Sequence, residues 1–180
     1  MRNPFKTGML FSILALATAG AVTAAPDIAR AEPAVVKVDR SHYTGTWLEI
    51  ARRPMWLTDG CVAGYTTYSR GIAPERVMVE DGCREGTPEG KLKTVHGIGT
   101  LKDMDTSRAK LRVRYPFLIT MDYWVLYKSP DKSWFISADP AMKNLWIYAR
   151  HVPSSKQLAR MTAKAAALGY DVRQLEYPAQ

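Results

Sequence analysis

The sequence has little of the chemistry on which enzymes and metalloproteins depend. It contains two cysteines and three histidines, and His42, His96 and His151 stand too far apart for the spacing of a metal site. Neither a phosphate-binding glycine loop nor a Gly-x-Ser-x-Gly nucleophile motif occurs. We therefore expect each histidine to be a surface or hydrogen-bonded residue. We expect no metal, no cofactor and no catalytic residue.

Long runs of like charge are also missing. The chain carries a formal net charge of +8, but its lysines and arginines are scattered along the sequence. Nucleic-acid-binding proteins gather such residues into a patch or stripe. The scatter is instead typical of a solvated surface, and no nucleic-acid partner is predicted.

The longest apolar run lies at the N-terminus. Arg2 and Lys6 precede an Ala- and Gly-rich stretch, Gly8–Ala25, which ends in small residues suited to cleavage. A membrane anchor is the alternative, but the run is at the short end for a span. We predict a cleaved signal peptide over residues 1–25 and a periplasmic or secreted protein. No cysteine near this region is available for a lipid, so no lipid anchor is expected.

Short β-type segments dominate the rest of the chain. Residues 26–37 contain prolines and alanines without a clear period, which predicts a loose N-terminal arm before a single domain over residues 38–178. Eight strand-like runs follow between residues 45 and 151: GTWLEIAR, CVAGYTTYSR, ERVMVEDGC, LKTVHGIGTLK, RAKLRVRY, MDYWVLYK, KSWFISAD and NLWIYARH. Short links between them predict an all-β, antiparallel up-and-down barrel of eight strands. Such a barrel is just wide enough to hold one small ligand.

One helix is predicted after the strands. In PSSKQLARMTAKAAALGY the apolar residues Leu158, Met161, Ala165 and Leu168 recur every three or four positions, and Gly169 is expected to end the helix as its C-cap. The sixth and eighth strands are apolar on both faces, which is typical of strands that are covered on both sides. We therefore expect the helix to pack on the outer wall of the sixth to eighth strands. A short ninth strand is predicted over residues 170–177.

The two cysteines bracket the second and third strands. A hairpin centred on Ile72 would place Ser69 opposite Glu75 and, continuing the same register, Cys61 opposite Cys83. Directly opposed residues lie at the Cα separation that a disulfide needs. We predict a Cys61–Cys83 disulfide, with a free buried pair as the alternative.

Three quoted segments resemble one family. YTGTWLEIARRP, GCVAGYTTYS and YWVLYKSPDKSWFISADPAMKNLWIYAR are similar in order and spacing to the lipocalins, in particular to the bacterial outer-membrane lipocalin and apolipoprotein D. The resemblance implies that Trp47 of the Gly-x-Trp motif packs across the closed end of the barrel beneath Arg150. It also implies that Gly45 leaves room where the chain enters. Two departures are the absent N-terminal lipid-bearing cysteine and KSWFISA in place of the usual Tyr-x-Tyr-Ala in the seventh strand.

The resemblance also implies a ligand site inside the barrel. It places Trp146 on the inner wall, and alternation along the strand adds Tyr148. It favours the face shared by Tyr123, Val125 and Tyr127 as the inward one. Met55 and Trp56 are expected at the open end, where they gate entry, and Phe135 is included without a supporting pattern. Arg112 or Arg114 near the mouth would meet an acidic head group, although an outward charged face is the plainer interpretation.

The predicted function is to carry or store a small hydrophobic ligand, a fatty acid, lysophospholipid or similar lipid, in the cell envelope. A monomer or weak dimer is expected, and membrane contact is left open. One alternative is a lipid-modifying enzyme, which would need a reactive thiol or paired acids that face the cavity. The other is an envelope protein with a protein-binding or structural role, which a fully packed barrel interior would favour.

Overall fold

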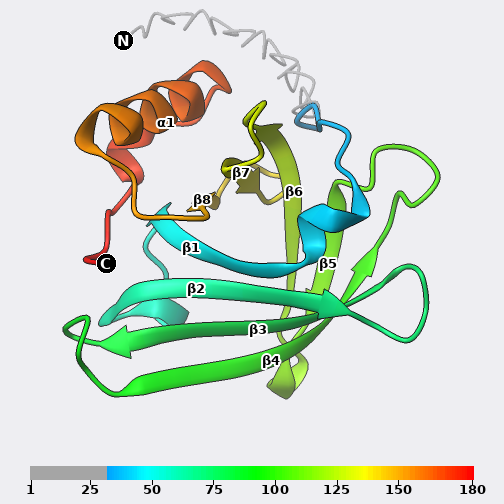
Figure 1. The fold of residues 1–180 in the computed structure, drawn as a ribbon, viewed down its shortest axis with the longest axis horizontal. Helices are drawn as coiled ribbons and strands as arrows, with labels where there is room; N and C mark the ends of the chain where they lie inside the picture. The colour runs from blue at the N-terminus through cyan, green and yellow to red at the C-terminus, as the bar shows by residue number, and fades with distance from the viewer. Residues whose placement is uncertain (1–31) are drawn as a thin grey trace, which may run out of the picture.

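A closed antiparallel barrel forms the body of the protein in the computed structural model, which describes residues 32–180 (Figure 1). Each strand pairs with its neighbours in sequence, and the first pairs with the eighth, so no edge is left open. All eight predicted strands are present: β1 Gly45–Arg52, β2 Cys61–Arg70, β3 Arg76–Glu85, β4 Leu92–Leu101, β5 Lys110–Arg114, β6 Thr120–Lys128, β7 Trp134–Ala138 and β8 Leu145–Ala149. The predicted signal peptide lies outside the described residues.

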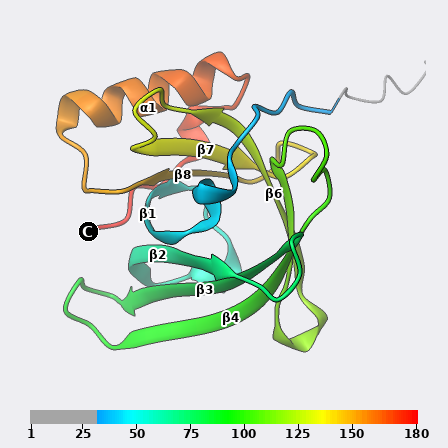
Figure 2. The same ribbon diagram turned by 45° about the vertical axis from the view of Figure 1, so that its right-hand side comes forward.

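The predicted helix, α1, spans Ser155–Ala167 and lies on the outside of the barrel, over β7 and β8 (Figure 2). The Ser154 side chain caps it by accepting a hydrogen bond from the Gln157 N–H, and Gly169 takes the left-handed conformation just beyond its end. Met161 and Ala165 are fully buried in a cluster with outward side chains of β6, β7 and β8. The expected outer wall is therefore confirmed.

The shorter segments correct two expectations. Four short 3-10 helices occur: η1 Arg40–Tyr43, η2 Trp56–Thr58, η3 Pro116–Leu118 and η4 Val172–Gln174. The predicted ninth strand is replaced by η4 and a single bridge between Arg52 and Glu176, because the chain turns at η4 before it reaches β1. Residues 32–37, the described part of the predicted arm, are not loose: the Val36 N–H bonds the Val125 carbonyl, and Val35 and Val36 pack against the barrel core.

The predicted disulfide between Cys61 and Cys83 is present, with a Cα–Cα distance of 5.5 Å, but the register from which it was predicted is wrong. Ser69 pairs with Met78 instead of Glu75, and Cys61 pairs with Glu85. A bulge between Val62 and Tyr65 shifts the ladder, and within it Ala63 has a positive φ of 44°. Cys83 therefore reaches Cys61 as a diagonal neighbour.

Reduction of this disulfide is expected to destabilise the protein. The bond spans 22 residues, and its loss releases a loop of that size in the unfolded chain, which costs about 2–4 kcal/mol of stability. Urea denaturation with and without reductant measures the difference. Equal midpoints under the two conditions would contradict the prediction.

The closed end of the barrel is built around Trp47. Its indole N–H donates to the His42 carbonyl at 3.1 Å, and the Arg150 guanidinium lies 3.4 Å from the centre of its ring. Arg150 also donates to the Thr44 and Thr46 carbonyls, so it fastens the start of β1 to the end of β8. The stacked pair that the resemblance implied is therefore present.

Gly45 begins β1 with a φ of +69°, which strains any residue with a side chain, and a Cβ there would lie 3.4 Å from Arg150 Nη1. This conformation, together with the nearby guanidinium, explains a glycine two residues before the tryptophan. His42 closes the same end among the Tyr43, Trp47 and Phe135 rings. A surface or hydrogen-bonded residue was expected, but His42 is buried and its Nε2 has no hydrogen-bond partner among the described residues. Burial lowers its pKa to about 3.

Replacing Trp47 with Ala should destabilise the fold by about 3–5 kcal/mol, because it empties a buried site and leaves Arg150 without its ring. Trp56→Ala is the matched control, since Trp56 is 79% exposed and its loss should change stability by less than about 0.5 kcal/mol. Chemical denaturation of both variants provides the measurement. If the Trp47→Ala protein were as stable as the control, Trp47 would not be the buried centre of the closed end.

Candidate functional site

A cavity of about 420 Å³ lies inside the barrel and opens at the end that carries η2 and η3. Its mouth is apolar: Met55, Trp56 and Leu57 come from the β1–β2 connection, and Phe117 and Ile119 from the β5–β6 connection. Trp56 and Phe117 are 79% and 95% exposed, so they form a rim that projects into solvent. An apolar molecule entering the barrel would meet these side chains first.

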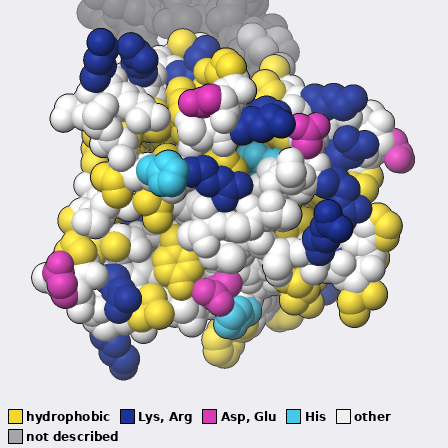
Figure 3. Space-filling model, in the orientation of Figure 1, with side chains coloured by type: hydrophobic (Ala, Val, Ile, Leu, Met, Phe, Trp, Pro, Cys, Tyr) yellow, Lys and Arg dark blue, Asp and Glu magenta, His cyan; other side chains and the backbone are white. Residues whose placement is uncertain are grey.

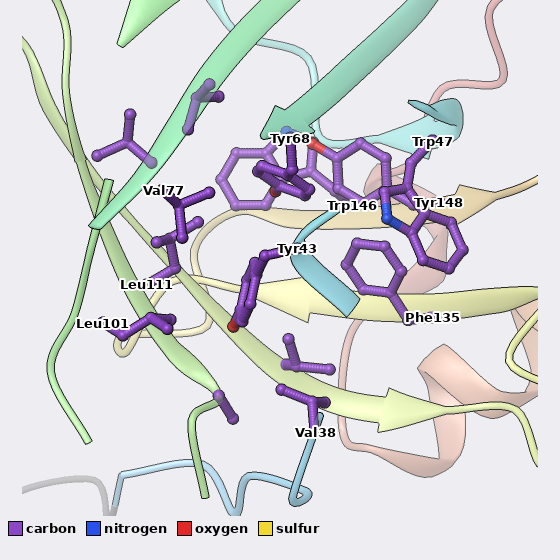
Figure 4. Packing of buried hydrophobic residues seen from close by; sticks show 14 of the residues in the cluster. Val38, Tyr43, Trp47, Tyr68, Val77, Leu101, Leu111, Phe135, Trp146 and Tyr148 are labelled. Atoms are coloured by element: carbon purple, nitrogen blue, oxygen red, sulfur yellow. The ribbon is translucent and has the colours of Figure 1, made fainter. Parts of the chain in front are cut away.

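The inner end of the cavity is more polar than its mouth. On each lining strand, one residue lies nearest the closed end, and together these residues form the cavity floor. They are Glu49, Thr66, Asp81, Val95, Tyr123 and Tyr148. Below the floor the barrel is filled by apolar and aromatic side chains, among them Tyr68, Val77, Leu101 and Leu111 (Figure 4).

Five of the eight predicted ligand residues border this cavity: Trp146, Tyr148, Tyr123, Met55 and Trp56. The Tyr123 and Trp146 rings pack against each other, with centroids 4.7 Å apart. Their contact with a ligand stays a prediction.

Val125 and Phe135 also point into the barrel, but they lie below the floor and do not line the cavity. Phe135 stacks on Tyr148 with the ring centroids 4.9 Å apart, and its edge meets Trp47 at 4.8 Å (Figure 4). Phe135 therefore supports the cavity floor from beneath and belongs to the packing of the closed end.

The inward orientation predicted for Tyr127 is wrong. The β6–β7 register shifts between Val125 and Tyr127, so strict alternation ends at Leu126. Tyr127 packs outside the barrel against Trp134, with centroids 4.8 Å apart, and beneath Lys164 of α1. Trp124, on the opposite face of β6 from Tyr123, points outward and joins the cluster under α1.

A buried ion pair borders the cavity and was not predicted from the sequence. Arg52 is 2% exposed; it donates to the Glu49 carboxylate, to Glu176 Oε1 at 2.6 Å, and to the Cys61 and Thr58 carbonyls at 2.7 and 3.2 Å. Residues three apart on a regular strand face opposite sides, but a bulge between Glu49 and Ala51 brings these two together. Burial raises the pKa of Glu49, and the adjacent guanidinium opposes that rise.

A second acid that lines the cavity, Asp81, was also missed; it is half-buried. Thr66 Oγ1 donates to its Oδ1 and the Tyr115 hydroxyl to its Oδ2, both at 2.5 Å, and the Tyr115 and Tyr123 hydroxyls lie 3.1 Å apart. Burial raises the pKa of Asp81, while the two donated hydrogen bonds oppose that rise. The sequence signal was present, because Asp81 follows Val77 and Val79 at the spacing of one strand face.

The basic residues proposed at the mouth face away from it. Arg112 forms a bidentate pair with Asp122, with both distances 2.8 Å, on the outer surface. Figure 3 shows lysines and arginines spread among apolar and acidic side chains on one face of the molecule. Lys93 does border the cavity mouth, where its ammonium pairs with Glu85 at 2.5 Å.

Over residues 32–180, no helix has the length and apolar character to cross a membrane. In the same range, no three potential metal ligands among His, Cys, Asp and Glu gather closely enough to hold an ion.

An eight-stranded barrel with one external helix and an internal cavity open at one end is the architecture of a class of small-molecule-binding proteins. A family model described as a lipocalin-like domain matches residues 38–180. The chain therefore belongs to the lipocalin family. Members of this family generally bind small hydrophobic ligands and act in binding or transport.

Individual relatives agree with this assignment. Temperature-induced lipocalin-1 of Arabidopsis thaliana is 30% identical over 154 residues, which cover 80% of this chain and 81% of that protein. Insecticyanin from the tobacco hornworm Manduca sexta shares the fold, with a TM-score of 0.63 and 16% identity over 83% of this chain and 84% of its own. Lobster apocrustacyanin A1 gives a TM-score of 0.58 and 14% identity over 83% and 90%.

The Asp81 carboxylate, which lines the cavity, predicts a pH-dependent stability difference. The Asp81 pKa in the folded protein lies above 3.8, so as the pH rises the unfolded chain loses this proton first, and stability falls until the folded form has ionised too. Asp81→Asn has no such proton. The variant should therefore gain stability relative to the wild type as the pH rises from below 3.8 to neutral.

Urea denaturation of the wild type and of Asp81→Asn, below pH 3.8 and at neutral pH, measures this stability difference. Glu80→Gln is the control for the loss of one negative charge, because neighbouring Glu80 faces outward and accepts from the Tyr65 hydroxyl. A stability difference between Asp81→Asn and wild type that stays constant with pH would contradict the prediction.

Proposed function

We propose that this lipocalin binds one small, lipid-like molecule in its barrel and carries or stores it in the cell envelope, in the periplasm or after secretion. The observation that carries the proposal is the open-ended cavity of about 420 Å³ with apolar walls and a polar floor. Burial of apolar ligand surface supplies the affinity at about 25 cal/mol per Å². The envelope location rests on the predicted signal peptide.

The Gly-x-Trp motif and the LWIYAR strand support a place near the bacterial outer-membrane lipocalin and apolipoprotein D. A fatty acid or lysophospholipid would need a partner for its negative head group. Arg52 is already bonded to four protein oxygens, which leaves Lys93 at the mouth as the cation that borders the cavity among residues 32–180.

Binding is favoured over catalysis for two reasons. Both cysteines of the chain are joined in the disulfide, so no thiol is available as a nucleophile. Two acids do face the cavity, but Arg52 neutralises Glu49, so Glu49 and Asp81 do not form a pair that shares a proton. The open cavity also counts against a purely structural role, for which a fully packed barrel interior would be expected.

A contrast between two tryptophans tests the proposal. We expect a neutral apolar fluorophore such as diphenylhexatriene to bind and to accept excitation energy from tryptophan. Trp146→Ala should weaken its binding by about 1–3 kcal/mol, because the change removes apolar contact from a desolvated wall. Trp124→Ala should lower stability and leave affinity unchanged, because Trp124 lies outside the barrel.

Fluorescence titration gives the affinity and chemical denaturation gives the stability. A fluorophore that does not bind the wild type would overturn the proposed function. If Trp124→Ala abolished binding in folded protein while Trp146→Ala did not, the ligand would lie outside the cavity.

A further inference from the structure

We propose that Asp81 makes the cavity selective for apolar molecules that carry a protonated amine, and that such a ligand enters with its head group first. The inference rests on the proposed function, since it concerns the same cavity. It concerns the chemical class of the ligand, which the fold and family leave open.

The hydroxyl protons of Thr66 and Tyr115, the two donors next to Asp81, are already used. Tyr115 has one hydroxyl proton and donates it to Asp81 Oδ2, so in its 3.1 Å contact with Tyr123 it must accept. Thr66 likewise gives its proton to Asp81 Oδ1. What the network still offers is acceptor lone pairs on the carboxylate and the hydroxyl oxygens. A ligand must therefore bring the donors.

The charge at the floor is unbalanced. Glu49 is paired with Arg52, but no ammonium or guanidinium among residues 32–180 lies within 4.0 Å of the Asp81 carboxylate. A carboxylate held inside the barrel without a cation is poorly compensated, and a cationic ligand relieves that cost while a carboxylate ligand increases it. An ammonium head supplies both the charge and three N–H donors.

The change in polarity along the cavity also favours a ligand whose head group lies at Asp81. Large apolar side chains lie at the mouth beside Lys93, and the acids Glu49 and Asp81 lie at the floor. An alkylamine fits with its head at Asp81 and its chain toward Trp56 and Phe117. A fatty acid would have to enter tail first, with its methyl end against Asp81 and its carboxylate beside Lys93.

Three ligands with the same twelve-carbon chain separate these modes: dodecylamine, dodecanol and dodecanoate. Each displaces diphenylhexatriene from the disulfide-bonded wild-type protein at neutral pH. We expect the amine to bind about 10- to 100-fold more tightly than the carboxylate, as for a hydrogen bond to a charged group, with the alcohol between them. The net charge of +8 favours the carboxylate at long range, so an amine preference reports the cavity.

Two matched variants locate the preference. Asp81→Asn should lose at least tenfold in amine affinity and bring the amine and the carboxylate to similar affinities, each referred to the diphenylhexatriene affinity measured for the same variant. Glu80→Gln removes the same charge one residue away on the outer face and should keep the wild-type order.

The outcomes separate this inference from the proposed function. If diphenylhexatriene fails to bind, the cavity is not a ligand site and both are wrong. If it binds but dodecanoate competes as well as dodecylamine, and Lys93→Gln weakens dodecanoate, the head group lies at the mouth and the inference alone is overturned. An amine preference that survives in Asp81→Asn would also overturn it.

Discussion

The hydrogen-bonded pairing of β1 with β8 closes the sheet into a barrel. The side chains that point inward can then pack only against one another. Arg150 reinforces this seam, because it leaves the end of β8, lies on Trp47 and donates to carbonyls at the start of β1. The closed end is filled with aromatic rings, and the remaining volume is left toward the mouth. The cavity therefore lies toward the mouth because the large rings occupy the closed end.

Three bulges then decide which side chains reach the interior. The one in β1 turns Arg52 toward Glu49, the one in β2 sets the register of the disulfide, and the one in β6 turns Tyr127 outward. Each inserts a residue into one strand only, so it reverses the alternation beyond that point. The interior therefore has a charged pair on β1, Glu49 and Arg52, that a regular strand would not have placed there.

Much of the fold was predictable because each barrel strand has clear limits: apolar residues recur along the strand, and turn residues mark its ends. The wall formed by Tyr123, Trp146 and Tyr148 was predictable for the same reason. Tyr127 and the register around Cys61 were not, because a bulge depends on pairing between strands and leaves no fixed residue pattern. The polar floor was missed differently: Asp81 shares the face of Val77 and Val79, but the partners that accommodate it come from β2 and the end of β5, distant in sequence.

The backbone carbonyl of Cys61 is one of the acceptors that hold Arg52, and Cys61 is tied to Cys83. The cross-link therefore fixes the acceptor that holds the guanidinium against Glu49. Without it, the carbonyl would move with the mouth end of β2, and the Glu49 charge would lose part of its compensation. The redox state of the surroundings therefore bears on the charge inside the barrel. The covalent bond that links β2 to β3 also helps to set how much negative charge an arriving molecule encounters.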